Sequence, residues 1–350
     1  MIFTAKKMLK KAAGVLTAAV MLFSQPMIYP QMTNAASTTD IYVGYSGRNN
    51  NYNTVREALS VCQQINPTSE ASRITVHIAP GTYREQLVIQ TPYITFVNDE
   101  PSKGDVVLTW YYGIGYKYYS VGSDGRYNAS NAAAKSSKAE PTQRWGGTVQ
   151  LLSKANDFKA ENIIFENSFN RYVTQEEIAD GVTPSGSQSI TFDRTNQWAD
   201  VRSKAATERG AALTIDADRA EFYNCKCLGS QDTLYTGSKT GYFRNCKIEG
   251  NTDYIFGSGD YVFDNCELSF FGYSSTAVGG YITAARQQTR GYLFNSCKIT
   301  GNPNQSVSSG YLGRPWSETA VVLFLNTTIQ NNNLIKAEGW TSMSGVQPTQ

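Results

Sequence analysis

Two aspartates occupy one position in consecutive repeats of the sequence, and this pairing indicates acid–base chemistry. Asp232 lies in the segment Gly229–Tyr235, and Asp253 lies in the similar segment Gly250–Gly257, 21 residues further on. A period of about 20–30 residues is typical of a solenoid, and equivalent residues on adjacent coils of stacked parallel strands lie about 4.8 Å apart. Two carboxylates that close cannot both ionise cheaply, so the pKa of one rises while a nearby cation holds that of the other low. The spacing predicts an acid and base pair on one face.

Other chemistry-bearing residues give less support for a catalytic site. The single histidine, His77, lies in the alternating strand Ile74–Ile78, where a structural role is favoured over catalysis, so a Ser-His-Asp or Cys-His site has little basis. An isolated aspartate at a solenoid corner is commonly a turn residue. Two aspartates in register, with Arg314 downstream as the candidate cation, favour chemistry instead.

A four-residue phrase, Phe-x-Asn-Cys, precedes each aspartate segment, and its recurrence extends the repeat and predicts the fold. Phe222 and Phe243 each lie ten residues before one of the two aspartates. The strands between turns are short and rich in Phe, Ile, Val and Tyr, with Asn, Gly and Asp at the corners. We therefore expect an all-β fold, a single-stranded right-handed parallel β-helix, with the repeated Phe side chains stacked in its interior. The phrase returns at Phe263, Phe294 and Phe324.

Insertions interrupt the repeat. Two stretches rich in Tyr and Ser, residues 110–147 and 170–209, lack the period, and we read them as loop insertions that pack or bind. Loops inserted at one corner of a solenoid commonly build its binding face. Within the first insertion, residues 129–140 are poor in apolar side chains and are expected to form an exposed, mobile excursion. Only residues 53–65 suggest a helix, which would cap the N-terminal end of the stack.

The composition separates an N-terminal leader from the rest of the chain. Residues 1–36 carry four lysines, then an apolar run over residues 12–23 and small residues at the end, which indicates a secretory signal too short to span a bilayer. Removal of these four lysines from the 31 basic residues leaves 27, compared with 29 acidic residues. This balance of charge favours neither nucleic acid nor an anionic membrane as a partner. We expect residues 37–350 to form one secreted, monomeric catalytic domain.

The cysteines predict packing in the interior. Cys225, Cys246, Cys266 and Cys297 share one phase of the repeat, so they should form a ladder on neighbouring coils. One disulfide between neighbours also fits the spacing in an exported protein. The sequence Cys-Lys-Cys at 225–227 is not zinc spacing, and with one histidine in the chain we expect no metal and no cofactor.

Three segments resemble the signature segments of pectin methylesterases. They are Gly229–Tyr235, Asp253–Gly257 and Leu312–Trp316, in that order and spacing, and Gly81–Glu85 is similar to an early segment of the same family. The resemblance extends from about Asp40 to Trp340. It implies a right-handed parallel β-helix, and a metal-free esterase that removes methyl groups from galacturonate units of plant cell-wall pectin.

The resemblance also implies a role for each site residue. Asp253 would attack the C6 ester carbonyl as nucleophile, and Arg314 would keep it ionised. Asp232 would protonate the departing methanol and then activate water, and Gln231 would donate to the oxyanion. The remaining residues, implied in substrate binding, are Trp316, Tyr235, Phe256 and Arg209.

Two departures from the family pattern and two alternative functions accompany this reading. Arg209 stands where the family usually has glutamine, and the family usually continues beyond Gly339–Trp340, so the C-terminal wall of the cleft is expected to differ.

A pectate or pectin lyase would use the same fold, but calcium-dependent forms need a denser acidic cluster than this sequence shows. A non-catalytic wall-binding solenoid would explain the aromatic insertions but not the registered aspartates.

Overall fold

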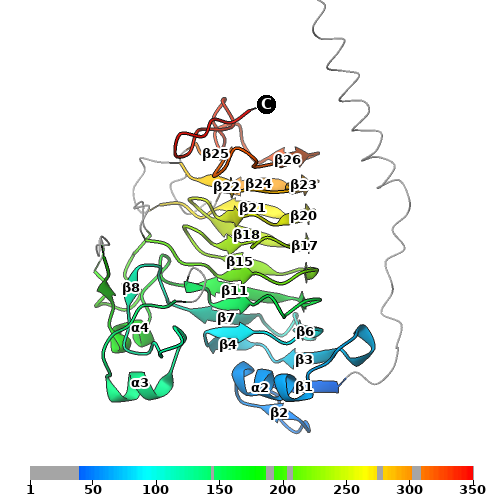
Figure 1. Cartoon of the computed structure of the whole chain (residues 1–350), viewed down its shortest axis with the longest axis vertical. Helices are drawn as coiled ribbons and strands as arrows, with labels where there is room; N and C mark the ends of the chain where they lie inside the picture. Colours follow the sequence, from blue (N-terminus) through cyan, green and yellow to red (C-terminus); the bar gives the residue numbers. More distant parts are fainter. Residues whose placement is uncertain are drawn as a thin grey trace, which may run out of the picture. The chain divides into compact units, whose positions relative to one another are not determined.

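A computed structural model of the chain describes residues 39–142, 146–186, 193–202, 208–273, 279–301 and 309–349. The leader predicted over residues 1–36 lies outside these residues. Within the compact unit Thr38–Gln350, short strands stack one above another (Figure 1). None of the helices in the described ranges is long and apolar enough to cross a membrane.

Three parallel sheets form the walls of this stack, as expected for the predicted right-handed parallel β-helix. From β3 onward, strands that follow one another along the chain belong to different sheets, and each sheet joins equivalent strands of neighbouring coils. In the order of pairing, sheet A contains β2 (Asn51–Tyr52), β1 (Thr39–Val43), β3 (Ile74–Ile78), β6 (Ile94–Val97), β10 (Lys159–Glu161), β14 (Ala220–Tyr223), β17 (Thr240–Arg244), β20 (Asp260–Asp264), β23 (Tyr292–Asn295) and β26 (Val322–Leu325).

The other two sheets repeat the same pattern. Sheet B contains β4 (Gly81–Arg84), β7 (Val106–Trp110), β11 (Ile163–Asn167), β15 (Lys226–Leu228), β18 (Lys247–Gly250), β21 (Glu267–Phe270), β24 (Lys298–Gly301) and β27 (Thr328–Ile329). Sheet C contains β5 (Leu87–Ile89), β9 (Val149–Leu151), β13 (Leu213–Ile215), β16 (Leu234–Tyr235), β19 (Ile255–Gly257), β22 (Tyr281–Ala285) and β25 (Tyr311–Gly313).

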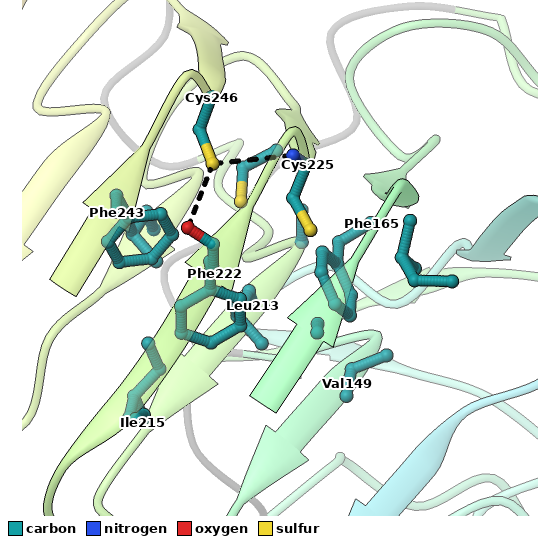
Figure 2. Packing of buried hydrophobic residues seen from close by; sticks show 14 of the residues in the cluster. Val149, Phe165, Leu213, Ile215, Phe222, Cys225, Phe243 and Cys246 are labelled. Atoms are coloured by element: carbon teal, nitrogen blue, oxygen red, sulfur yellow. Dashed lines mark hydrogen bonds between the residues drawn. The ribbon is translucent and has the colours of Figure 1, made fainter. Parts of the chain in front are cut away.

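The repeated phenylalanine phrase fills the interior, as the sequence predicts (Figure 2). Phe222 and Phe243 pair across β14 and β17, and their stacked rings have centroids 4.4 Å apart. The stack continues to Phe263 at 5.1 Å. At the next coil toward the N-terminus the register position is Ala160, and Phe158 fills the space there, 6.0 Å from Phe222. The coils from Phe96 to Phe324 therefore contribute rings to one continuous column, whereas Val76 and Ile41 take this position in the first two coils.

The asparagine and the cysteine that follow each of these phenylalanines form the corner of the coil and part of its interior. The asparagines Asn224, Asn245 and Asn265 have φ between 52° and 53° at the corner that follows sheet A, a left-handed conformation that asparagine tolerates better than most residues. The next residue is a cysteine of the expected ladder. All six cysteines lie in the described residues, where they are free and buried thiols, and the Cys225 N–H lies 3.3 Å from Cys246 Sγ (Figure 2).

A helix caps the N-terminal coil, as predicted, although it begins later than residue 53. In α2 (Val55–Ile65), Thr54 Oγ1 accepts the Glu57 N–H and the Glu57 carboxylate accepts the Thr54 N–H, a capping box that fixes the first turn. Its apolar side joins the core of the stack. The buried residues of this side are Val55, Ala58, Leu59 and Cys62.

The expectation of a single helix was wrong, because each insertion contains a short one. They are α3 (Ala129–Ala134) and α4 (Gln175–Asp180), and β8 (Tyr116–Lys117) pairs antiparallel with β12 (Thr183–Pro184) to join the two insertions. A second aromatic cluster, centred on Trp110 and Phe169, gives the insertions a core of their own.

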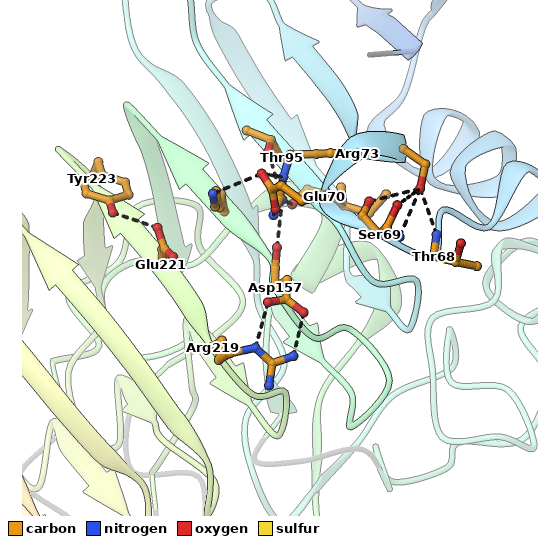
Figure 3. A network of polar contacts seen from close by, with 12 residues as sticks. Thr68, Ser69, Glu70, Arg73, Thr95, Asp157, Arg219, Glu221 and Tyr223 are labelled. Atoms are coloured by element: carbon orange, nitrogen blue, oxygen red, sulfur yellow. Dashed lines mark hydrogen bonds and ion pairs between the residues drawn. The ribbon is translucent and has the colours of Figure 1, made fainter. Parts of the chain in front are cut away.

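Polar side chains also connect the coils outside the core (Figure 3). Arg73 follows the 3₁₀ turn Glu70–Ser72, pairs with Glu70, and donates through Nη1 to the carbonyl of Asp157 at 2.8 Å. Arg219 forms a bidentate pair with the Asp157 carboxylate at 2.8 and 2.7 Å. These contacts link segments 62 and 84 residues apart in the sequence.

We expect Phe243→Ala to lower the free energy of unfolding by about 3–5 kcal/mol, because it removes a ring that is stacked on both sides and leaves a cavity. Phe243→Leu should cost less than about 1.5 kcal/mol. Urea unfolding curves would measure both changes. The control is Leu323→Ala, since Leu323 is 55% exposed on β26. A loss of unfolding free energy in Phe243→Ala that is no larger than in this control would contradict a stabilising column of stacked rings.

Candidate active site

The two aspartates lie at equivalent places on adjacent coils, as the repeat predicts. Asp232 ends the turn before β16, and Asp253 ends the turn before β19. Leu234 pairs with Ile255 across these parallel strands, so the offset of 21 residues is the register of the sheet. The Asp232 N–H donates to the carbonyl of Thr252 at 3.0 Å, which joins the two turns directly. The carboxylates are therefore placed one coil apart at the same edge of sheet C.

Each aspartate occupies a tight turn that the sequence builds with a glycine. Asp232 and Asp253 have φ of 63° and 51°, the left-handed region that Asp and Asn enter more readily than other residues with a Cβ. A Cβ at Gly229 would lie 2.6 Å from Thr233 Oγ1, and one at Gly250 would lie 2.3 Å from Tyr254 Cβ. Glycine three residues before each acid is therefore a steric requirement of the turn.

Arg314 holds one of the two acids. Its Nε and Nη2 donate to Asp253 Oδ1 and Oδ2 at 2.8 and 2.6 Å, a bidentate pair. The backbone N–H of Arg314 donates to the carbonyl of Thr283 at 3.0 Å, so sheet C fixes the point from which the side chain extends. The guanidinium also lies over the ring of Tyr281, 4.1 Å from its centroid. The predicted cation thus contacts one carboxylate in a fixed orientation.

Burial and charge give the two acids different pKa values. Asp232 and Asp253 are 6% and 5% exposed, and loss of water raises the pKa of both carboxyl groups. The neighbouring carboxylate of Asp253 raises the pKa of Asp232 further, to well above its ordinary range. The Arg314 guanidinium opposes the rise in the pKa of Asp253 through hydrogen bonds and charge. The pKa of Asp232 therefore lies above that of Asp253, so that Asp253 ionises first.

Aromatic side chains extend from the acids along sheet C. Tyr235 and Phe256 are paired in register, with ring centroids 5.2 Å apart. Trp316 follows at 6.4 Å from Phe256, and the Arg286 guanidinium lies 4.9 Å from the Trp316 ring. Tyr235 and Trp316 are half-buried. The three rings predicted to bind substrate are thus brought together beside the acids.

The other two predicted residues are Gln231 and Arg209. Gln231 is 5% exposed and directly precedes Asp232, and its carbonyl accepts the Gly210 N–H at 3.3 Å. Arg209, just before this glycine, is half-buried. Its positive charge opposes the rise in the pKa of both Asp232 and Asp253.

Sequence reasoning missed two tyrosines of the site. Tyr273 is 5% exposed, and its hydroxyl hydrogen-bonds that of Thr252. Burial raises the pKa of Tyr273, and the charge of Asp253 adds to the rise. Tyr281 supports Arg314 and stacks on Tyr311 with centroids 5.5 Å apart. Tyr281 and Tyr311 are 30 residues apart, an offset of the repeat, so the periodicity could have identified this pair. Tyr273 follows β21 without such a signal.

No group of three or more His, Cys, Asp or Glu side chains in the described part of the chain is arranged to hold a metal ion. His77 is placed away from the acids, where its ring nitrogens contact the carboxylates of Asp99 at 2.5 Å and Asp40 at 3.2 Å and its ring stacks on Tyr42. This agrees with the structural role expected for it.

We expect Asp232→Asn to raise the melting temperature at pH 7. The folded state raises the pKa of Asp232, so this carboxyl favours folding fully only below the ordinary aspartate pKa of about 3.9, and its contribution is lost as the pH rises toward the folded value. Asparagine carries no ionisation cost and tolerates the left-handed turn. Thermal unfolding between pH 3 and 7 would measure the difference.

The gain in melting temperature should shrink as the pH falls through about 3.9. Glu318→Gln, at an exposed acid, serves as the control and should show no comparable gain. An Asp232→Asn protein that is no more stable than the wild type at pH 7 would contradict the proposed burial cost.

Comparison with known proteins gives a consistent result. The family model described as Pectinesterase matches residues 183–349. Probable pectinesterase A of Neosartorya fischeri is 31% identical over 246 residues, which cover 64% of this chain and 74% of that protein. The solved structure of the pectin methylesterase from Aspergillus niger in deglycosylated form is similar, with 26% identity, a TM-score of 0.60, and coverage of 89% of this chain and 83% of that one.

Plant relatives are longer than the matched region. Probable pectinesterase/pectinesterase inhibitor 58 of Arabidopsis thaliana is 26% identical over 322 residues, which cover 89% of this chain and 45% of that protein. Pectinesterase QRT1 of the same plant is covered to 58% of its length. The chain thus spans about half the length of these two relatives.

Proposed function

The chain belongs to the pectinesterase family, and from this premise and the geometry of its two acids we propose that it hydrolyses C6 methyl esters of galacturonosyl units in pectin, releasing methanol and pectate. The observation that supports the proposal best is the asymmetric acid pair. Asp253 is held by the bidentate contact with Arg314, while the pKa of Asp232 is raised well above its ordinary range. One acid is suited to act as a nucleophile and the other as a proton donor.

In the first step, an oxygen of the Asp253 carboxylate attacks the C6 ester carbonyl. The tetrahedral intermediate then breaks its bond to the methoxy oxygen, and the Asp232 carboxyl group gives its proton to that oxygen, so that methanol leaves. Asp253 remains joined to C6 as an anhydride. Asp232 is now ionised, and its negative charge is formed only after that of Asp253 has been consumed, which avoids two adjacent carboxylates.

In the second step, the Asp232 carboxylate takes a proton from water as the water oxygen attacks the C6 carbonyl. The bond between C6 and the Asp253 oxygen breaks, and Asp253 leaves as a carboxylate stabilised by Arg314. The product is the galacturonic acid unit, and Asp232 carries its proton again. The same residue acts as acid and then as base.

The surrounding residues supply binding and charge stabilisation. Gln231, adjacent to Asp232, is proposed to donate to the oxyanion, an interaction often worth about 3 kcal/mol. Arg209, whose charge reaches both acids, is proposed to bind the substrate near the same oxygen. Tyr235, Phe256 and Trp316 would stack on sugar rings beside the reacting unit. With the leader predicted from the sequence, we infer that the protein acts outside the cell as a monomer.

Replacing either acid with asparagine should lower kcat by several orders of magnitude, because both act on the same reacting atoms. The double variant Asp253→Asn, Asp232→Asn should be little worse than either single variant, since residues that act as a unit are not additive. Methanol release from methylated pectin would be measured, with far-UV circular dichroism to show that each variant is folded.

Activity of Asp253→Asn within about tenfold of the wild type would exclude this residue as the nucleophile. The same reactions should be assayed for unsaturated uronides. Formation of such products without methanol would identify a lyase, and the absence of both would favour a wall-binding protein.

Arg314→Gln should move the acid limb of the pH profile of kcat/KM to higher pH. Without the cation, the pKa of Asp253 rises, so its carboxylate is lost at a higher pH than in the wild type; an opposite charge at hydrogen-bond distance typically lowers a carboxylate pKa by about 1–3 units. Arg314→Lys should recover part of this shift, because lysine restores the charge but not the planar fork.

The profiles of all three proteins would be measured on a soluble methylated oligogalacturonide. A uniform loss of activity with an acid limb that does not move would mean that Arg314 binds substrate without tuning Asp253.

A further inference from the structure

One arginine of the second insertion contacts the turns of both acids. Arg171 follows β11, and its side chain is 12% exposed. Its Nη1 donates to the carbonyl of Gly229 at 3.1 Å and to Glu249 Oε1 at 2.9 Å. Gly229 begins the turn of Asp232. Glu249 directly precedes the turn of Asp253. A single guanidinium nitrogen therefore joins the two turns at the ends where they leave sheet B.

The position of this guanidinium is fixed by buried carboxylates. Glu249 is 5% exposed, and its Oε2 lies 2.9 Å from Lys247 Nζ. A second glutamate, Glu166 on β11, is 7% exposed and places its Oε2 3.5 Å from Arg171 Nε. Glu166 and Glu249 occupy one register position of sheet B, on either side of Leu228. Arg171 is thus held between two glutamates that the stacking of the coils places.

The same guanidinium supports the loop that follows β21. It lies 4.0 Å from the centroid of the Phe271 ring, and the Phe271 N–H donates to the carbonyl of Gly250 at 2.9 Å. Gly272 then exchanges hydrogen bonds with the Asn251 side chain, donating to Oδ1 at 2.8 Å and accepting from Nδ2 at 3.3 Å. Asn251 lies two residues before Asp253. This loop is therefore a second support for the turn of Asp253.

These contacts suit positioning better than they suit stability. A buried ion pair contributes little net free energy of folding, because the loss of water offsets the attraction between the charges. Charge-assisted hydrogen bonds are short and directional, however, and here they fix the distance between two backbone segments of neighbouring coils. The acids follow these contacts by three and four residues. Movement at the sheet B ends of the turns would therefore change the separation of the two carboxyl groups.

We propose that Arg171 is a positioning residue that sets the separation of Asp232 and Asp253 by tying their turns together. The proposal rests on the function proposed above, in which both acids must reach one ester group. Arg314 orients the Asp253 carboxylate itself, whereas Arg171 fixes the backbone that carries both acids. Without this link the turns loosen, and the repulsion between the two carboxyl groups moves them apart.

The kinetic test uses a double variant that leaves no new unpaired charge at this pair. Arg171→Met, Glu249→Gln removes one positive and one negative charge together. The matched control is Arg73→Met, Glu70→Gln, because Arg73 is also a buried arginine that pairs with a glutamate and donates to a carbonyl of another coil, but beside sheet A. In methanol release, kcat of the first variant should fall about 10- to 100-fold, since a misplacement of about 1 Å can cost about a hundredfold. KM should stay the same, because the aromatic rings proposed to bind sugar are unchanged, and the control should keep both constants.

The pH profile of kcat/KM separates positioning from a general loss of stability. If the acids move apart, the charge of Asp253 raises the pKa of Asp232 less. The basic limb, which reports loss of the Asp232 proton, should then move to lower pH, since Arg209 and Arg314 are still present to act on this acid. Arg171→Lys, which keeps the charge without the planar fork, should lie between the wild type and the double variant. A double variant that matches its control in both kcat and the basic limb would overturn the proposal.

A titration without substrate separates this proposal from the proposed activity. Carbon-13 NMR of labelled aspartate carboxyl groups would follow the pKa of Asp232, which should be lower in the double variant than in the wild type and unchanged in the control. If the wild type releases no methanol but this shift is seen, the activity fails and the positioning role stands. If it releases methanol and the double variant has an unchanged or higher pKa, only the positioning role fails. Should the double variant not fold, Arg171→Lys with Arg73→Lys as its control gives the same comparison.

Discussion

The parallel register between neighbouring coils is the constraint on which the site depends. Because sheet C joins equivalent residues of consecutive coils, a residue type repeated at the right offset is repeated in space at one strand spacing. The same rule produces the column of phenylalanine rings and the pair of acids. The stacked rings and the paired acids therefore both depend on the same register, and a shift of one coil by one residue would disrupt both the column and the acid pair.

Charge distinguishes two acids that the repeat places alike. Burial raises the pKa of both carboxyl groups, and the repeat provides no difference between Asp232 and Asp253. Arg314 supplies the difference, because its fork contacts only Asp253. It comes from a coil with a longer loop, and its orientation is fixed by Tyr281 beneath it. Arg314, which lies outside the repeated segments, thus gives different pKa values to two acids that occupy equivalent positions.

The sequence predicted the fold wherever the period was visible and failed where it was not. The Phe-x-Asn-Cys phrase identified the coils of β14, β17 and β20, because each of its residues has one steric role in the ring column, the left-handed corner or the buried ladder. The insertions have no period, and α4 was missed although Thr174 and Glu177 carry a local N-cap signal. Tyr273 near the acids could not be predicted, since a loop brings it there.

The absence of disulfides among the six described cysteines has a consequence for how the molecule opens. Coils held only by their neighbours can fray one at a time from an end of the stack. The N-terminal end is covered by α2, whereas β26 and β27 at the other end expose Leu323 and Ile329. Arg314 follows β25, the terminal strand of sheet C. Fraying of that coil would withdraw the guanidinium while both acids stayed in place, so that loss of the charge asymmetry would precede loss of the fold.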